Sequence, residues 1–139
     1  MGEKVSSTRW FGVALQALIV LASTEEVCPS GVLADKLNSK SAFLRKVLTH
    51  LVKADLIQAK EGRDGGYYLL KDPSDITLEK VYDAMKAEPF PKGFFDVESN
   101  ECFAPTTREA LFDLRDDLEN WVVEGLKQKT IADLLNKKE

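Results

Sequence analysis

The stretch from Leu33 to Leu70 constrains the fold more than any other part of this 139-residue chain. A short helix around residues 32–37 is followed by a turn and then by a second helix. In this second helix, apolar residues recur at the one-face spacing i, i+3, i+4 and i+7: Leu44, Val47, Leu48 and Leu51. Two short strand segments follow, joined by a glycine-rich turn at residues 62–66. Helix, turn, helix and two-stranded wing, in that order, predict a winged helix-turn-helix.

The region around the second helix is locally basic, although the whole chain has a net charge of −4. The acidic excess lies in residues 89–139. Residues 36–63 hold only two acidic side chains, Asp55 and Glu61. Against them stand seven bases: Lys36, Lys40, Arg45, Lys46, Lys53, Lys60 and Arg63. Because phosphate neutralisation depends on the local patch, the acidic net charge does not exclude a nucleic-acid partner.

The outward side of the second helix suits contact with a DNA duplex. Short polar side chains and a lysine stand at the turn and the helix start: Asn38, Ser39, Lys40 and Ser41. Such donors can bind phosphates, and the helix dipole adds to the attraction. Arg45, one turn further, could bind a guanine through two hydrogen bonds, a contact worth about 1–3 kcal/mol of discrimination. A solvated amphipathic helix would show the same pattern, but the adjoining glycine-rich basic wing favours DNA reading. We therefore interpret the chain as a transcriptional regulator.

Length and composition set the outer limits of the interpretation. The chain is long enough for one domain, or for a small domain with an oligomerisation arm. Its longest apolar run, from Trp10 to Ala22, is shorter than the roughly 20 residues of a membrane span. It also lacks the cleavage pattern of a signal peptide, so we expect no membrane partner and a cytoplasmic protein. The two cysteines, Cys28 and Cys102, give no disulfide framework.

The expected fold is mainly α with a small β-wing. A winged helix-turn-helix domain (residues 1–86) precedes a proline-rich loop (87–105) and a long helix with a short closing helix (106–139). Apolar residues of the long helix are spaced 3, 4, 3, the pattern of a helix that pairs with another: Leu111, Leu114, Leu118 and Trp121. Core packing within one chain would also explain it. We favour a dimerisation seam, because the winged domain already accounts for its own core.

Capping residues predict where several helices begin. Ser30 and Thr77 are each expected to be the N-cap of the helix that follows. Thr130, with Asp133 at the third helical position, is expected to open the closing helix with a reciprocal pair of side-chain to backbone hydrogen bonds.

The chain resembles the Rrf2 family of bacterial winged-helix regulators, which includes an iron–sulfur cluster regulator and a cysteine-metabolism repressor. The segments that carry the resemblance are 33–39, 44–48, 51–57, 62–69, 76–82 and 130–135. The family implies a homodimeric repressor built on the long helix. Such a dimer reads a pseudo-palindrome in double-stranded DNA, with half-sites about 34 Å apart. Carried over residue by residue, the DNA-binding positions are Ser39, Lys40, Ser41, Arg45 and Lys46, with Arg63 and Gly65 on the wing.

Two residues depart from the family pattern. Asp55 stands at the usual glycine before the first strand, where we expect a positive φ that aspartate tolerates better than most residues. Glu61 stands where the family has a basic residue before the first wing glycine, and Arg63 would supply that charge from within the turn.

The sequence leaves more than one interpretation of the signal that the regulator senses. Better-known family members hold an iron–sulfur cluster on cysteines of the loop, whereas this loop contains only Cys102. A cluster needs about four thiolate or equivalent ligands, so we expect no metal and no cofactor. Cys102 could be a thiol sensor, because the following helix dipole would favour its thiolate, or a small packing residue. Four loop aromatics could line a pocket for a small-molecule effector or simply anchor the loop: Phe90, Phe94, Phe95 and Phe103.

Other functions fit the sequence less well. A winged-helix protein–protein adaptor without operator binding would not need the basic row on the second helix. An enzyme is not expected, because the sequence shows no nucleophile–base pair. The glycine-rich turn at residues 62–66 also lacks the lysine and the strand-to-helix setting of a phosphate-binding loop.

Overall fold

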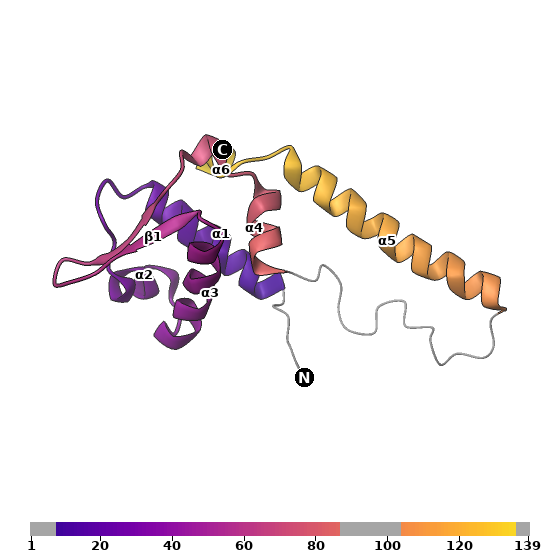
Figure 1. Cartoon of the computed structure of the whole chain (residues 1–139), viewed down its shortest axis with the longest axis horizontal. Coiled ribbons are helices and arrows are strands. Elements are labelled where there is room, and N and C mark those ends of the chain that lie inside the picture. The colour runs from indigo at the N-terminus through magenta and orange to yellow at the C-terminus, as the bar shows by residue number, and fades with distance from the viewer. Residues whose placement is uncertain (1–7, 87–103, 136–139) are drawn as a thin grey trace.

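A computed structural model describes residues 8–86 and 104–135 of the chain (Figure 1). The elements follow the order α1 (Thr8–Ala22), α2 (Ser30–Leu37), α3 (Ser41–Lys53), β1 (Ile57–Lys60), β2 (Gly66–Leu69), a 3₁₀ turn (Pro73–Asp75), α4 (Leu78–Met85), α5 (Pro105–Lys127) and α6 (Ile131–Leu135). The predicted fold class is confirmed: mainly helical, with a two-stranded wing and a long C-terminal helix.

Helix α1 is the centre of the core. Its sequence is apolar almost all round, and such a helix is stable only when it is buried. Ala14, Ala17 and Leu18 are fully buried. The helix contacts elements from both ends of the chain: α2, α3, β2, α4 and α6. The winged domain is therefore assembled around α1.

Helix α3 buries the face that its sequence spacing predicted. Leu44, Val47, Leu48 and Leu51 are each no more than 1% exposed. They pack in the same core as Leu33 of α2 and Val81 of α4. Since the four apolar residues occupy one side of α3, the polar residues between them are turned to the solvent.

The wing is an antiparallel hairpin that is hydrogen-bonded to the loop between α1 and α2. Its register runs from Ile57 opposite Leu69 to Lys60 opposite Gly66. Cys28 extends the sheet by one position: its N–H donates to the Tyr67 carbonyl and its carbonyl accepts from the Tyr67 N–H, both at 2.9 Å. A side chain on Gly66 would overlap the carbonyl group of Cys28. Glycine is thus required where these two backbones meet.

Local signals in the sequence were mostly reliable. Asp55 has the expected positive φ, 63°. Thr77 caps α4 by accepting a hydrogen bond from the Lys80 N–H, and Thr130 and Asp133 form the expected reciprocal pair. The expectation for Ser30 was wrong. Ser30 is the first residue of α2, the extended residue before it is Pro29, and no side chain caps this end.

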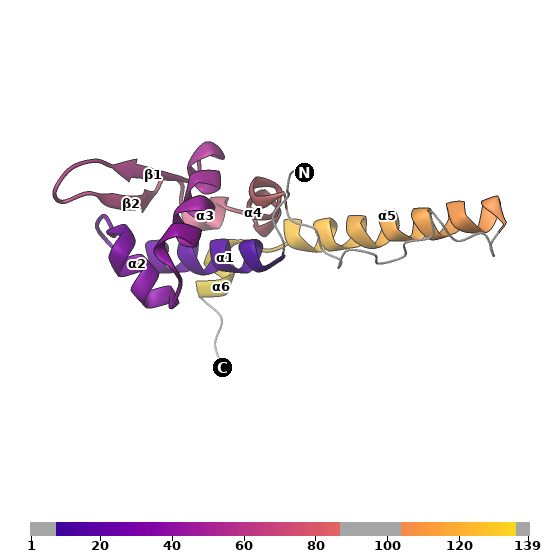
Figure 2. The same cartoon turned by 90° about the horizontal axis from the view of Figure 1, so that it is seen from below.

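Helix α5 projects from the body like an arm (Figures 1 and 2). At about 1.5 Å per residue, its 23 residues span about 35 Å. Its C-terminal half contacts α4, where the Tyr82 hydroxyl lies 3.4 Å from Glu119 Oε2. The chain then returns to the core through α6, where Ile131 is fully buried and its N–H donates to the Ile76 carbonyl. Among the described residues, no helix is both long and apolar enough to cross a membrane.

The contact between Gly66 and Cys28 makes a stability prediction. Gly66→Ala should lower the free energy of unfolding by about 1–3 kcal/mol, because a Cβ there cannot fit without moving the wing. Gly12→Ala is the control: a Cβ at this α1 position meets nothing within 4 Å, so the variant should gain up to about 1 kcal/mol. Chemical denaturation measures both variants. Equal stability of Gly66→Ala and the wild type would show that the wing does not need this close approach.

Candidate nucleic-acid interface

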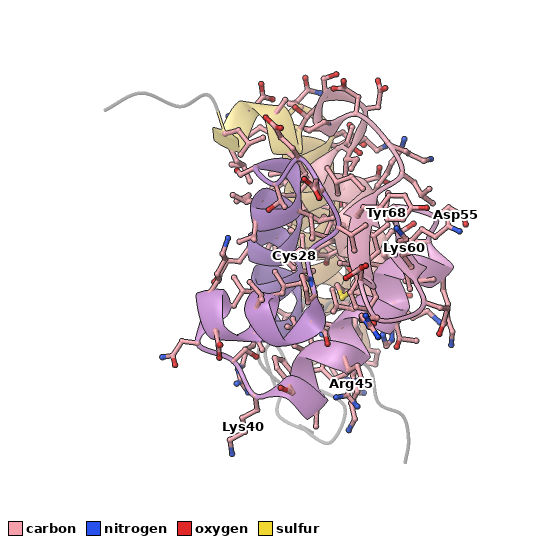
Figure 3. The ribbon with its side chains drawn as sticks, turned by 90° about the vertical axis from the view of Figure 1, so that its left-hand side faces the viewer. Cys28, Lys40, Arg45, Asp55, Lys60 and Tyr68 are labelled. Carbon is pink, nitrogen blue, oxygen red and sulfur yellow. The ribbon has the colours of Figure 1, made fainter. Side chains whose placement is uncertain are left out.

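The outward side of α3, together with the turn before it, carries the predicted contact residues, and we call this region the reading surface. It comprises Ser39, Lys40, Ser41, Arg45 and Lys46, of which all but the half-buried Ser39 are exposed. Figure 3 shows Lys40 and Arg45 near the same end of the molecule, with Lys60 and Tyr68 of the wing further away. The structure therefore brings the five helix-turn-helix residues together on one surface.

Backbone hydrogen bonds hold the turn before α3 in one shape. Asn38 ends α2 in the left-handed conformation, with φ 50°. The Ser39 N–H donates to the Ala34 carbonyl at 3.0 Å, and the Ser39 hydroxyl lies 3.4 Å from the Lys40 carbonyl. Because this turn is rigid, the start of α3 is fixed relative to α2.

The wing carries Arg63 and Gly65, the other two predicted contacts. Arg63 is exposed near the hairpin turn, and Gly65 is half-buried. The Gly65 N–H donates to the Gly62 carbonyl at 3.0 Å, and a side chain on Gly65 would overlap the Lys60 carbonyl. Gly65 therefore has a steric role in closing the hairpin. Contact of either residue with DNA stays a prediction.

One basic residue next to the reading surface was missed by the sequence analysis. Arg9 of α1 places its guanidinium carbon 4.5 Å from the centre of the Phe43 ring. Trp10 meets the same ring edge-on, with ring centres 5.4 Å apart, and meets His50 edge-on at 5.5 Å. Nothing in the spacing of α1 could have revealed these contacts, because they join residues more than thirty positions apart.

A groove of about 650 Å³ separates α1 from the turn that precedes α3. Arg9 and Lys40 give it positive charge. Its other lining residues are polar or apolar and uncharged: Gly12, Val13, Gln16, Leu37, Asn38, Ser39 and Phe43. The groove thus continues the reading surface onto α1.

The residues predicted to dimerise lie on α5, away from the reading surface, and those predicted to sense a signal are not described. Cys102 and the loop aromatics fall outside the described residues. On α5, Leu114 and Trp121 are 38% and 64% exposed, whereas Leu111 and Leu118 are half-buried. Within the described segments, no group of three or more His, Cys, Asp or Glu side chains is placed to hold a metal ion.

The chain is similar to known regulators over nearly its whole length. Residues 7–137 match the model of the family Rrf2, described as an iron-dependent transcriptional regulator. A Bacillus subtilis (strain 168) protein named as an HTH-type transcriptional regulator, YwnA, is 28% identical over 123 residues, which cover 86% of this chain and 90% of that protein.

Solved structures of similar fold agree with this match. CymR, the global cysteine regulator of B. subtilis, is 25% identical, with a TM-score of 0.66 over 99% of this chain and all of that one. IscR of T. potens is 24% identical, with a TM-score of 0.69 over 97% of this chain and 88% of that one, which is evidence for the fold alone.

Proposed function

The chain belongs to the Rrf2 family of transcriptional regulators, and from this premise we propose that it is a homodimeric repressor that binds a pseudo-palindromic operator. The family and the relatives are DNA-binding transcriptional regulators and not enzymes, as the sequence predicted. One observation carries the proposal: α3 buries its whole apolar face while Arg45 and Lys46 are exposed on its outward side. A helix so displayed can enter the major groove.

In this proposal some residues of the reading surface contact bases and others contact phosphates. Arg45 and Lys46, together with Ser41, face base edges in the major groove, where arginine can bind a guanine with two parallel hydrogen bonds. Lys40 and Ser39 bind backbone phosphates beside the start of the helix. Arg63 contacts the DNA from the wing, next to Gly65.

The second subunit is proposed to pack on α5. In the single described chain no residue of α5 is buried, and its 23 residues leave Leu114 and Trp121 open to solvent. Most of the stability of a helix in a protein comes from packing of its apolar face, so this exposed apolar stripe favours a partner surface. Leu111 and Leu118 continue the same face, since positions three and four apart align on a helix. A matching helix from a second copy would bury this stripe.

The residues present do not fit an iron–sulfur cluster. The whole sequence has two cysteines and one histidine. Cys28 is buried in the core beside the wing, and His50 Nδ1 lies 2.9 Å from the Lys46 carbonyl oxygen. A cluster held by one chain needs about four thiolate or equivalent ligands, which this donor set does not supply. We therefore propose that DNA binding needs no cluster. A small-molecule effector or oxidation of Cys102 would then be the source of a signal.

The first prediction concerns base reading by Arg45. The duplex is one that the wild type enriches from a random-sequence pool. Arg45→Ala should weaken binding to it by about 1–3 kcal/mol and relax the preference at one base pair in each half-site. Lys127→Gln, which also removes one positive charge but lies on α5, should bind like the wild type. If the variant keeps its preference, Arg45 contacts a phosphate instead of a base.

The same duplex tests repression. Placed within a promoter, it should lower transcription in vitro when the protein is added. If the wild type enriches no sequence, and its weak DNA binding does not fall with added salt, the adaptor interpretation would hold instead.

A second prediction concerns the dimer. Leu114→Asp should convert the dimer to a monomer, because the new carboxylate would be buried in the seam without a partner. Asn120→Asp adds the same charge on the opposite side of α5 and should remain dimeric. Light scattering gives the mass of each variant. A dimeric Leu114→Asp protein would place the subunit contact on another surface.

A third prediction concerns iron. Anaerobic incubation with ferrous iron and sulfide should leave both the visible absorption and the DNA affinity of the protein unchanged, and Cys102→Ser should behave in the same way. A cluster spectrum that Cys102→Ser abolishes would contradict the proposal and would indicate a cluster shared between subunits.

A further inference from the structure

The side of α3 that faces α1 carries a row of aromatic and basic residues. Phe43, Lys46, His50 and Lys53 follow one another at i, i+3, i+7 and i+10, so they share one side of the helix. The two aromatic members are covered by Trp10, while Lys46 and Lys53 are exposed. Arg9 lies over Phe43, and so adds a positive charge at the level where the row begins. We call Arg9, Lys46 and Lys53 the α1-side row.

The contact with Phe43 suits Arg9 for binding a phosphate. The guanidinium carbon of Arg9 lies over the ring, and the N–H donors of a guanidinium lie in the plane of the group. Those donors match two oxygens of a phosphate. Because the contact with Phe43 restricts the side chain before DNA arrives, less conformational entropy is lost on binding. Arg9 is exposed, so a duplex can reach it.

The charge around the reading surface is uneven and favours this flank. Of the residues that the structure describes, Arg9 and Lys40 are the charged ones that line the groove beside Arg9, and none is acidic. The wing is balanced, with Lys60 and Arg63 against Glu61 and Asp64. A second groove of about 650 Å³, between β1 and the loop that joins α1 to α2, is lined by Glu25, Glu26 and Glu61, and Lys60 is the one base among its described lining residues. A polyanion is therefore attracted to the α1 side of α3 and not to this second groove.

We propose that Arg9 is a further DNA-contacting residue, which binds a backbone phosphate in the groove between α1 and the turn before α3. Helix α1 is then part of the interface as well as the centre of the core. This proposal rests on the operator binding proposed above. Arg9 and Lys40 line the same groove, so Arg9 extends onto α1 the phosphate contact proposed for Lys40.

The test measures the salt dependence of binding for the full-length protein on the enriched duplex. Arg9→Gln should reduce the slope of log affinity against log salt by about 0.9 for each bound subunit, with no change in base preference. Arg9→Lys keeps the charge and should keep the slope, with a several-fold loss of affinity because an ammonium lacks the paired donors. Lys127→Gln is the matched control for the loss of one charge. In ethylation interference, one phosphate should weaken binding of the wild type when it is ethylated, and this interference should be lost only in Arg9→Gln.

The outcomes separate this inference from the proposed function. Thermal denaturation should first show that Arg9→Gln is folded. If the folded variant then has the wild-type salt dependence and interference pattern, the proposed role of Arg9 is overturned. In that case Arg45→Ala in the same assay would still report on base reading. A changed base preference in Arg9→Gln would also overturn the phosphate assignment. A wild type that enriches no duplex would overturn both proposals together.

Discussion

Burial of one face of α3 against the core is the constraint on which the rest of this structure depends. Leu44, Val47, Leu48 and Leu51 can all leave water only in one rotation of the helix about its axis. At about 25 cal/mol for each Å² of apolar surface, exposing them would cost several kcal/mol. The same rotation turns Arg45 and Lys46 to the solvent. The orientation of the charged side is thus set mainly by the burial of the apolar side.

Helix α1 links this core to the surface. Ala14, Ala17 and Leu18 in its middle are fully buried. Its first turn meets two different helices: Trp10 contacts Phe43 and His50 of α3, and Phe11 meets Tyr82 of α4 edge-on at 5.6 Å. Tyr82 in turn lies within hydrogen-bond distance of Glu119 on α5. A continuous line of contacts therefore joins the reading helix to the long arm. In the proposed dimer, the position of each reading surface relative to its partner would depend on this line.

Two glycines of the wing are needed because a side chain on either would collide with neighbouring backbone atoms. Gly66 lies where the backbone of Cys28 crosses, and Gly65 lies where the hairpin closes on the Lys60 carbonyl. The paired backbone bonds of Cys28 and Tyr67 hold the wing close to its turn, since Tyr67 lies opposite Ala59. The charged residues of the wing lie at the turn and are balanced in sign. The wing is thus well fixed but contributes little net positive charge, so in the proposed complex the attraction of DNA would come mainly from α3 and its α1 side.

The sequence by itself determined the elements, their order, the buried face of α3, the caps at Thr77 and Thr130 and the positive φ of Asp55. Each of these depends on residues a few positions apart, so periodicity and side-chain chemistry suffice to predict them. Only the tertiary structure decided that Cys28 pairs with Tyr67, that Arg9 lies over Phe43, and that Leu114 and Trp121 are more open than Leu111 and Leu118. These contacts join segments far apart in the chain. Their geometry follows from how α1 packs against α3 and α4, which no local pattern encodes.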